Sequence, residues 1–297
     1  MSTKRTLSFT PWGALYAIVS GLMGLLGFSA CVSEKPSVWK RTEGKWSYDG
    51  SPFDAADPET LHAIDGRFAA DAVQAYYRGT PLPGSDPATL EILDEHHARD
   101  RTTVFWCDTY RKGQDYYTVR YARVEAITDA DPATYRVLKY EYSADAKRAY
   151  KAGRMLRAVR DPASFEVLTP RLARDHTRAY FEDVEIPDSD GATFEIIDVH
   201  DDAWVRDRAH AWHVRSGQAG AGEPVTREVR MLVGAQAPSL RPLGHEYATD
   251  GVRLWWRGTT IRDAELTSFA SVDGDDTLDA RDSRGPFVRG KRVVVKP

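Results

Sequence analysis

A short frame recurs along this chain, in which an aspartate is followed five residues later by an aromatic residue. The frame occurs seven times, at Asp71, Asp100, Asp145, Asp175, Asp207, Asp250 and Asp282, and the aromatic residues are Tyr76, Phe105, Tyr150, Tyr180, Trp212, Trp255 and Phe287. Only 11% of the residues are aromatic, so chance does not account for this regularity. A frame that recurs in this way indicates a repeat architecture built from one supersecondary unit.

Between these frames lies a second recurring pattern, Asp-Pro followed by Thr or Ser and an apolar run. It begins at Asp57, Asp86, Asp131 and Asp161, with the variant DGATF at Asp190, and the successive spacings are 29, 45, 30 and 29 residues. We interpret the spacing of 45 as one unit that carries an insertion. A catalytic motif needs only one copy, so the repetition favours a structural part.

Each pattern predicts a local structure. An aspartate followed by small or polar residues, between two apolar segments, is typical of a tight turn that joins two strands. In the other pattern, Asp161 can cap a helical turn, Pro162 suits its first position and Ser164 lies where the cap bonds. We therefore expect one short helical turn at each Asp-Pro. A longer helix over residues 86–100 is the alternative, because so short an apolar run does not separate helix from strand.

Adjacent aromatic residues close several frames, for example Tyr76 with Tyr77 and Trp255 with Trp256. Neighbouring strand residues face opposite sides of a sheet, so each pair would cover both faces. A single hairpin is only marginally stable in water, and neighbouring units must therefore bury one another's rings. We predict an all-β or β-dominated domain of tandem β-hairpin repeats, each ~30 residues long, with short helical turns at Asp-Pro. A solenoid, a sandwich and a closed ring are all compatible with this pattern.

Two stretches break the period. Residues 108–124 predict a lengthened hairpin in which Tyr116, Tyr117, Thr118, Val119 and Tyr121 form additional strand. Residues 215–245 begin with a run of glycine and alanine that is typical of a loop. Insertions in repeat proteins often lie on the binding face, so we expect a functional surface at these two stretches first.

The repeated units resemble a known family. Copies of x-A-x-D-x-x-x-x-aromatic-aromatic-x-G, followed by A-D-P-x-[ST]-[FLY]-x-[IV]-L, are similar to the DKNYY family of bacterial repeat proteins over about residues 37–297. The Lys-Asn that follows the family's aspartate is replaced here, for example at Ala72, Arg101 and His176. The resemblance implies an exported repeat protein. It brings no catalytic residues, because the family has no established enzymatic activity.

The N-terminus predicts export. Lys4 and Arg5 precede an uncharged apolar stretch from Trp12 to Ala30, which is the pattern of a signal peptide. The sequence FSAC at residues 28–31 resembles the lipobox of bacterial lipoproteins, in which the cysteine is acylated and becomes the new N-terminus. The alternative is an uncleaved signal anchor, since ~20 apolar residues can span a bilayer.

From this pattern we expect a signal peptide at residues 1–30, lipidation of Cys31, a short tether at 31–36 and the repeat domain at 37–297. Whether the segment is cleaved and Cys31 is acylated, or the segment stays as a signal anchor, we expect the domain to be extracytoplasmic. It would then be tethered to a membrane of the bacterial cell envelope by the lipid or by the anchor. The sequence does not distinguish the periplasmic side from the outer membrane.

The net charge and the cysteine content exclude some classes of partner and chemistry. Without residues 1–30 the chain has 38 Lys and Arg against 44 Asp and Glu, a net charge of −6. Nucleic-acid binding normally requires a basic field, so we expect no nucleic-acid partner. Cys107 is the only cysteine besides Cys31. Its apolar neighbours predict a buried residue rather than a reactive thiol.

Two histidine groups are the candidates for a metal site. His96 and His97 lie beside Glu95, and His210 and His213 lie near Asp207, in a combination that suits zinc. Residues three apart in a strand face opposite sides, however, so we predict no metal ligand. The sequence has no nucleophile elbow, phosphate-binding loop or dinucleotide fingerprint. We accordingly predict no catalytic residue and no cofactor.

The sequence therefore predicts a non-enzymatic interaction or scaffold module of the cell envelope, tethered to the membrane, with an envelope protein or a glycan as candidate partner. Trp255 and Trp256, bracketed by Arg253 and Arg257, are candidates for stacking on a sugar, although we expect them in the core. The alternative function is an envelope hydrolase or a metal-dependent enzyme whose site lies in the inserted loops.

Overall fold

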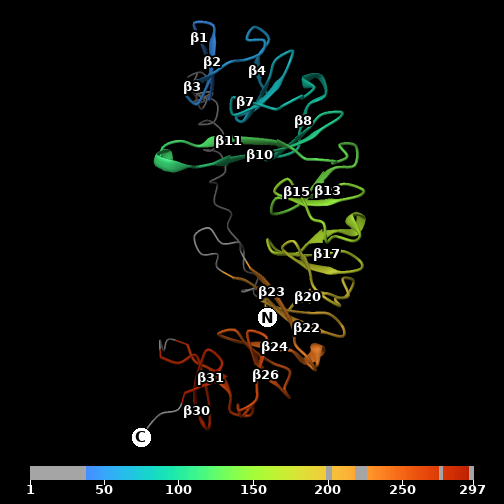
Figure 1. The fold of residues 1–297 in the computed structure, drawn as a ribbon, viewed down its shortest axis with the longest axis vertical. Helices are drawn as coiled ribbons and strands as arrows, with labels where there is room; N and C mark the ends of the chain where they lie inside the picture. Colours follow the sequence, from blue (N-terminus) through green and yellow to red (C-terminus); the bar gives the residue numbers. More distant parts are fainter. Residues whose placement is uncertain (1–37, 199–202, 218–225, 274–276, 294–297) are drawn as a thin grey trace, which may run out of the picture. The chain divides into compact units, whose positions relative to one another are not determined.

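The computed structural model of the chain describes residues 38–198, 203–217, 226–273 and 277–293. By its internal contacts the repeat domain forms one compact unit that begins at Trp39. The predicted signal peptide, Cys31 and the tether lie outside the described residues. Figure 1 colours the described chain along the sequence.

This unit is a succession of small antiparallel sheets (Figure 1). The first has three strands, β1 (Trp39–Thr42), β2 (Lys45–Tyr48) and β3 (Ser51–Phe53). Seven four-stranded sheets follow, which we call modules 1 to 7. In every module the strands lie in the sheet in the same order as in the sequence, so each module is a simple meander.

The strand bounds of the first four modules are as follows. Module 1 holds β4 (His62–Ala63), β5 (Phe68–Ala70), β6 (Ala75–Tyr77) and β7 (Thr80–Pro81). Module 2 holds β8 (Glu91–Ile92), β9 (His97–Arg99), β10 (Val104–Tyr110) and β11 (Tyr121–Ala126). Module 3 holds β12 (Arg136–Val137), β13 (Tyr142–Ala144), β14 (Ala149–Lys151) and β15 (Arg154–Met155). Module 4 holds β16 (Glu166–Val167), β17 (Leu172–Arg174), β18 (Ala179–Phe181) and β19 (Val184–Glu185).

The last three modules repeat this plan. Module 5 holds β20 (Glu195–Ile196), β21 (Trp204–Arg206), β22 (Ala211–Ser216) and β23 (Arg227–Met231). Module 6 holds β24 (Arg241–Gly244), β25 (Tyr247–Thr249), β26 (Leu254–Trp256) and β27 (Thr259–Ile261). Module 7 holds β28 (Ala270–Ser271), β29 (Ala280–Asp282), β30 (Gly285–Val288) and β31 (Lys291–Arg292).

The predicted fold class is confirmed, since the domain is strand-dominated and built from tandem hairpins. The helical segments among the described residues are the 3₁₀ turns η1 (Pro87–Thr89), η2 (Gly113–Asp115), η3 (Pro162–Ser164) and η4 (Ala237–Ser239). Two of them begin at the proline of an Asp-Pro, as expected. At Asp57 and Asp131 the chain forms a hydrogen-bonded turn instead of a helical segment. The longer helix over residues 86–100 is wrong, because β8 and β9 lie there and pair with each other.

The cap at Asp161 differs from the prediction. Asp161 stands at the N-cap position of η3, but its side chain accepts no backbone hydrogen bond there. The carboxylate accepts the Ser164 hydroxyl at 2.6 Å instead. In η1 the Asp86 side chain does accept from the Ala88 amide, at 3.2 Å.

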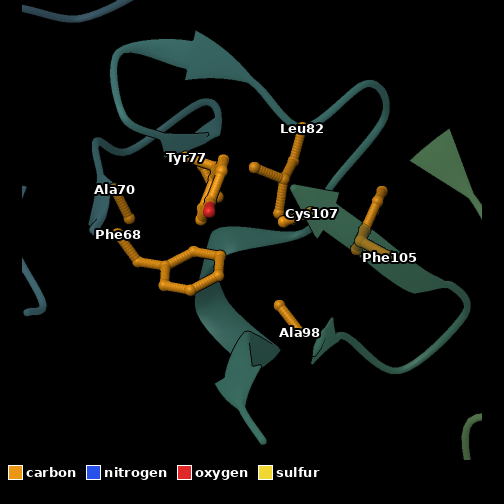
Figure 2. Packing of buried hydrophobic residues seen from close by; sticks show 8 residues of the cluster. Phe68, Ala70, Tyr77, Leu82, Ala98, Phe105 and Cys107 are labelled. Atoms are coloured by element: carbon orange, nitrogen blue, oxygen red, sulfur yellow. The ribbon is translucent and has the colours of Figure 1, made fainter. Parts of the chain in front are cut away.

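The core lies between successive modules. Each of the six junctions has its own cluster of buried apolar side chains, drawn from both neighbouring sheets. Figure 2 shows the junction of modules 1 and 2, where Phe68, Tyr77 and Leu82 share a cluster with Ala98 and Cys107. A module therefore acquires a core only by packing against its neighbours.

The adjacent aromatic residues divide between these clusters. In module 4, Tyr180 packs into the junction with module 3, whereas Phe181 packs into the junction with module 5. In module 6, Trp255 and Trp256 divide in the same way between the junctions on either side. Strand alternation thus places one ring of each pair in each junction.

The inserted stretch 108–124 lengthens one hairpin, in which β10 and β11 pair from Phe105 with Ala126 to Tyr110 with Tyr121. The prediction of extra strand at Tyr116, Tyr117, Thr118 and Val119 is wrong. These residues follow η2 as a turn, and only Tyr121 belongs to β11. In stretch 215–245 the described residues form β23, η4 and β24, and residues 218–225 lie outside the described residues.

Candidate functional site

The seven recurrent aspartates form the turns between the second and third strands of the modules. Asp175 is representative and is only 2% exposed. Its Oδ1 accepts the amides of Thr177 and Arg178 at 2.7 and 2.8 Å. Its Oδ2 accepts the Asp161 amide at 2.8 Å and the Tyr180 hydroxyl at 2.6 Å. One buried carboxylate therefore joins its own turn to the preceding Asp-Pro segment.

The bond to the preceding segment recurs in the other modules. An amide at the start of each Asp-Pro segment or its equivalent donates to the Oδ2 of Asp71, Asp100, Asp145, Asp207, Asp250 and Asp282. These aspartates sit in separate modules, each engaged by its own turn. Each lies at the end of the second strand of its sheet or directly after it.

Hydrogen bonding keeps the buried carboxylate of Asp175 charged. Burial on its own would raise the pKa of Asp175, but the bonds from Tyr180, Asp161, Thr177 and Arg178 outweigh it and lower the pKa to about 2. The partner hydroxyl responds in the opposite sense, since burial and the adjacent carboxylate raise the pKa of Tyr180. A neutral tyrosine donating to an ionised aspartate is a stable structural pair.

The histidine groups do not come together. His97 and His213 are fully buried, whereas the His210 side chain is 44% exposed in the Asp207 turn. Burial lowers the pKa of His213 to about 4, with the nearby arginines adding to the effect, and both of its ring nitrogens lack a hydrogen-bond partner. His213 packs against the Trp204 ring at 4.7 Å, as an apolar core residue does.

The second histidine group is also engaged in packing. His97 Nδ1 lies 2.9 Å from the Asp94 carboxylate, and the His96 ring stacks on Trp106 at 5.0 Å. Within the described part of the chain, no group of three or more His, Cys, Asp or Glu side chains is arranged to hold a metal ion.

Cys107 and the tryptophan pair occupy core positions. Cys107 is fully buried with a free thiol, and burial raises the pKa of that thiol. Trp255 is fully buried and Trp256 is half-buried. Trp255 therefore offers no face to a sugar, and the expectation that it belongs to the core is confirmed.

The β10–β11 hairpin carries three exposed tyrosine side chains, one of which is the most exposed aromatic side chain among the described residues. The exposed fractions are 87% for Tyr117, 51% for Tyr116 and 42% for Tyr110. Lys112 lies over the Tyr121 ring, with Nζ 4.4 Å from the ring centroid. Exposed aromatic rings beside cations are characteristic of binding surfaces, because rings supply contact area at low entropic cost.

A groove of about 450 Å³ lies beside the base of this hairpin. Asp108 and Arg123 of the hairpin line one part of it, and Glu182, Asp183 and Arg227 line another. Arg227 belongs to β23 and forms an ion pair with Asp183, at 2.6 Å. The two lengthened hairpins of modules 2 and 5 thus contribute to one charged groove over the turns of modules 3 and 4.

Sequence reasoning placed the functional surface at the two insertions, and the groove and the exposed tyrosines both involve them. It missed the residues of modules 3 and 4 that line the groove, such as Lys151 and Met155. No sequence pattern distinguishes these residues from their counterparts in other modules, because the groove arises from tertiary packing.

Comparison with protein-family models, with curated proteins and with solved structures gives no match. No helix among the described residues is long and apolar enough to cross a membrane.

Proposed function

We propose that this protein is a membrane-anchored, extracytoplasmic bacterial repeat lipoprotein, related to the DKNYY family, that serves as a non-enzymatic interaction or scaffold module of the cell envelope. The observation that carries the interaction role is the β10–β11 hairpin. It replaces the two-residue turn found at the same place in module 1 and presents exposed tyrosines to solvent. The anchor rests on the charged flank, the apolar stretch and the small residues before Cys31.

The hydrogen bonds made by the recurrent aspartates favour a scaffold role rather than a catalytic role. General acid–base chemistry needs a carboxyl group that exchanges a proton near the working pH. Hydrogen bonds hold the pKa of Asp175 at about 2, and they also lower the pKa values of Asp71, Asp100, Asp145 and Asp250. These groups serve the turns of the repeat.

The anchor is tested by replacing Cys31 with serine and labelling cells with radioactive palmitate. We expect the label on the natural chain and none on Cys31→Ser, because acylation requires the thiol. Cys107→Ala is the matched control and should keep the full label, since Cys107 lies in the core. Label retained by Cys31→Ser would refute the lipoprotein assignment.

The interaction role is tested on the hairpin. The double variant Tyr116→Ser, Tyr117→Ser removes the two most exposed rings, and we expect it to lose the envelope component that co-purifies with the natural chain after cross-linking. The control Val73→Ser changes a residue that is 61% exposed and lies outside both inserted stretches, and it should retain that component.

Equal recovery with both variants would contradict the role of the hairpin. Stoichiometric zinc in the purified chain would contradict the non-enzymatic part of the proposal and favour a metal-dependent envelope enzyme.

A further inference from the structure

A second pocket, of about 370 Å³, lies where the β10–β11 hairpin meets the start of the domain. The β2–β3 hairpin contributes Asp49 and Ser51, the β6–β7 turn contributes Arg78, and the β10–β11 hairpin contributes Arg111, Thr118 and Arg120. Three segments far apart in the sequence therefore converge on one concavity that is rich in guanidinium groups.

The three arginines of this pocket lack carboxylate partners. Most arginines of the domain form an ion pair, for example Arg99 with Glu91 and Arg174 with Glu166. Within the described part of the chain, no Asp or Glu oxygen lies within 4.0 Å of Arg78, Arg111 or Arg120. Asp49 is the only acidic residue in the lining.

Packing fixes Arg78 in place but leaves its Nε without a hydrogen-bond partner. Its guanidinium carbon lies 5.8 Å from the Tyr48 ring centroid and 5.7 Å from that of Tyr77. Its Nε is buried and has no hydrogen-bond acceptor in the structure. Rings that hold a guanidinium leave its remaining N–H groups available to a ligand. Arg111 donates one N–H to the Tyr116 carbonyl, at 3.0 Å.

The charge of the pocket identifies the ligand chemistry. Three arginines against one aspartate leave a local charge of +2, whereas the whole chain carries −4. Like charges gathered in a concavity repel one another and attract a counter-ion. A phosphate monoester carries about −1.5 to −2 at neutral pH and offers three acceptor oxygens, which matches this charge and this number of guanidinium donors.

We infer that the pocket formed by Arg78, Arg111 and Arg120 binds the phosphate group of a ligand. Ser51 and Thr118 add hydroxyl groups at its wall. The inference deepens the proposed function, on which it rests only for the idea that the hairpin is a binding surface. It does not depend on the lipid at Cys31.

The test uses the full-length chain in a non-ionic detergent, with inorganic phosphate titrated by isothermal calorimetry. We expect saturable binding that weakens as salt is raised, and a loss of about tenfold or more in affinity for Arg111→Gln, Arg120→Gln together. Arg157→Gln is the matched control, because Arg157 is exposed and lines neither this pocket nor the groove beside the base of the hairpin. The control should bind phosphate as the natural chain does.

A second titration, with dihexanoyl phosphatidylglycerol below its micelle concentration, distinguishes a lipid headgroup from a free phosphate. Binding of either probe that the double variant loses and the control keeps supports the inference. Absence of binding to both, or equal binding by the double variant, overturns it. If both probes fail to bind while Tyr116→Ser, Tyr117→Ser still loses its envelope component, the proposed function stands and only the inference is rejected.

Discussion

At the scale of single residues, one buried carboxylate per module carries several hydrogen bonds at once. Asp175 accepts from amides of its own turn, from the Asp161 amide and from the hydroxyls of Thr177 and Tyr180. A carboxylate offers acceptors only, so both oxygens can receive all of these donors. An amide in its place would turn one acceptor into a donor and leave buried groups unpaired.

We predict that Asp175→Asn lowers the free energy of unfolding by about 2 kcal/mol at pH 7. The pKa of Asp175 falls from 3.8 to about 2 on folding, so its contribution is complete above pH 4 and is lost as the pH falls through 2. The difference between natural chain and variant, measured by urea denaturation, should therefore shrink over that interval.

The control for this prediction is Asp54→Asn, which alters an exposed aspartate and should change stability by less than about 0.5 kcal/mol. An equal loss in both variants would show that the carboxylate of Asp175 has no special role. If the difference in unfolding free energy between the natural chain and Asp175→Asn stays constant down to pH 2, the charge of Asp175 does not contribute to stability.

At the scale of the element, the two-residue turn between third and fourth strands sets both the hairpin and its packing. In module 3 this turn consists of Ala152 and Gly153, with φ of +47° and +72°. Positive φ at both positions is the geometry that matches strand twist and favours glycine. A Cβ on Gly153 would lie 2.7 Å from the Cβ of Trp106 in module 2. The turn of one module thus rests directly on the second aromatic residue of the module before it.

Local patterns predicted the elements well where the repeat determines them. The Asp turns, the short turn at Pro162 and the division of the aromatic pairs all follow from turn chemistry and strand alternation. Tyr116 and Tyr117 were misassigned as strand because tyrosine favours strands, whereas η2 precedes them and diverts the chain into a turn.

Arginines that tie consecutive modules together were not predicted from the sequence. Arg206 donates to the Ala237 and Pro238 carbonyls of η4 at 3.0 and 2.8 Å, and Arg174 donates to the Phe194 carbonyl at 3.0 Å. The signal available was an arginine directly before the recurrent aspartate. The phosphate pocket had no such signal, because Arg78 and Arg120 meet only through the course of the lengthened hairpin.

At the scale of the whole molecule, stability is a sum over junctions between neighbours. The core clusters join modules adjacent in sequence, so a defect at one junction reaches the two modules that form it first. The sequence predicted this dependence from the marginal stability of one hairpin. It did not predict how modules rotate relative to one another, because that depends on side-chain packing at each junction.

The last prediction separates backbone strain from a junction contact. Gly153→Ala and Gly50→Ala both place a side chain at positive φ, +72° and +79°, which costs about 1–2 kcal/mol. Nothing lies within 4 Å of a Cβ on Gly50, whereas Gly153→Ala also forces Trp106 to move, at a further cost of about 1–3 kcal/mol. Gly153→Ala should therefore unfold at lower urea concentration than Gly50→Ala. In hydrogen exchange it should deprotect β9, β10, β13 and β14 while leaving β25 and β26 unchanged. Deprotection spread evenly over all modules would contradict junction-by-junction stability, because it would make the domain one cooperative unit.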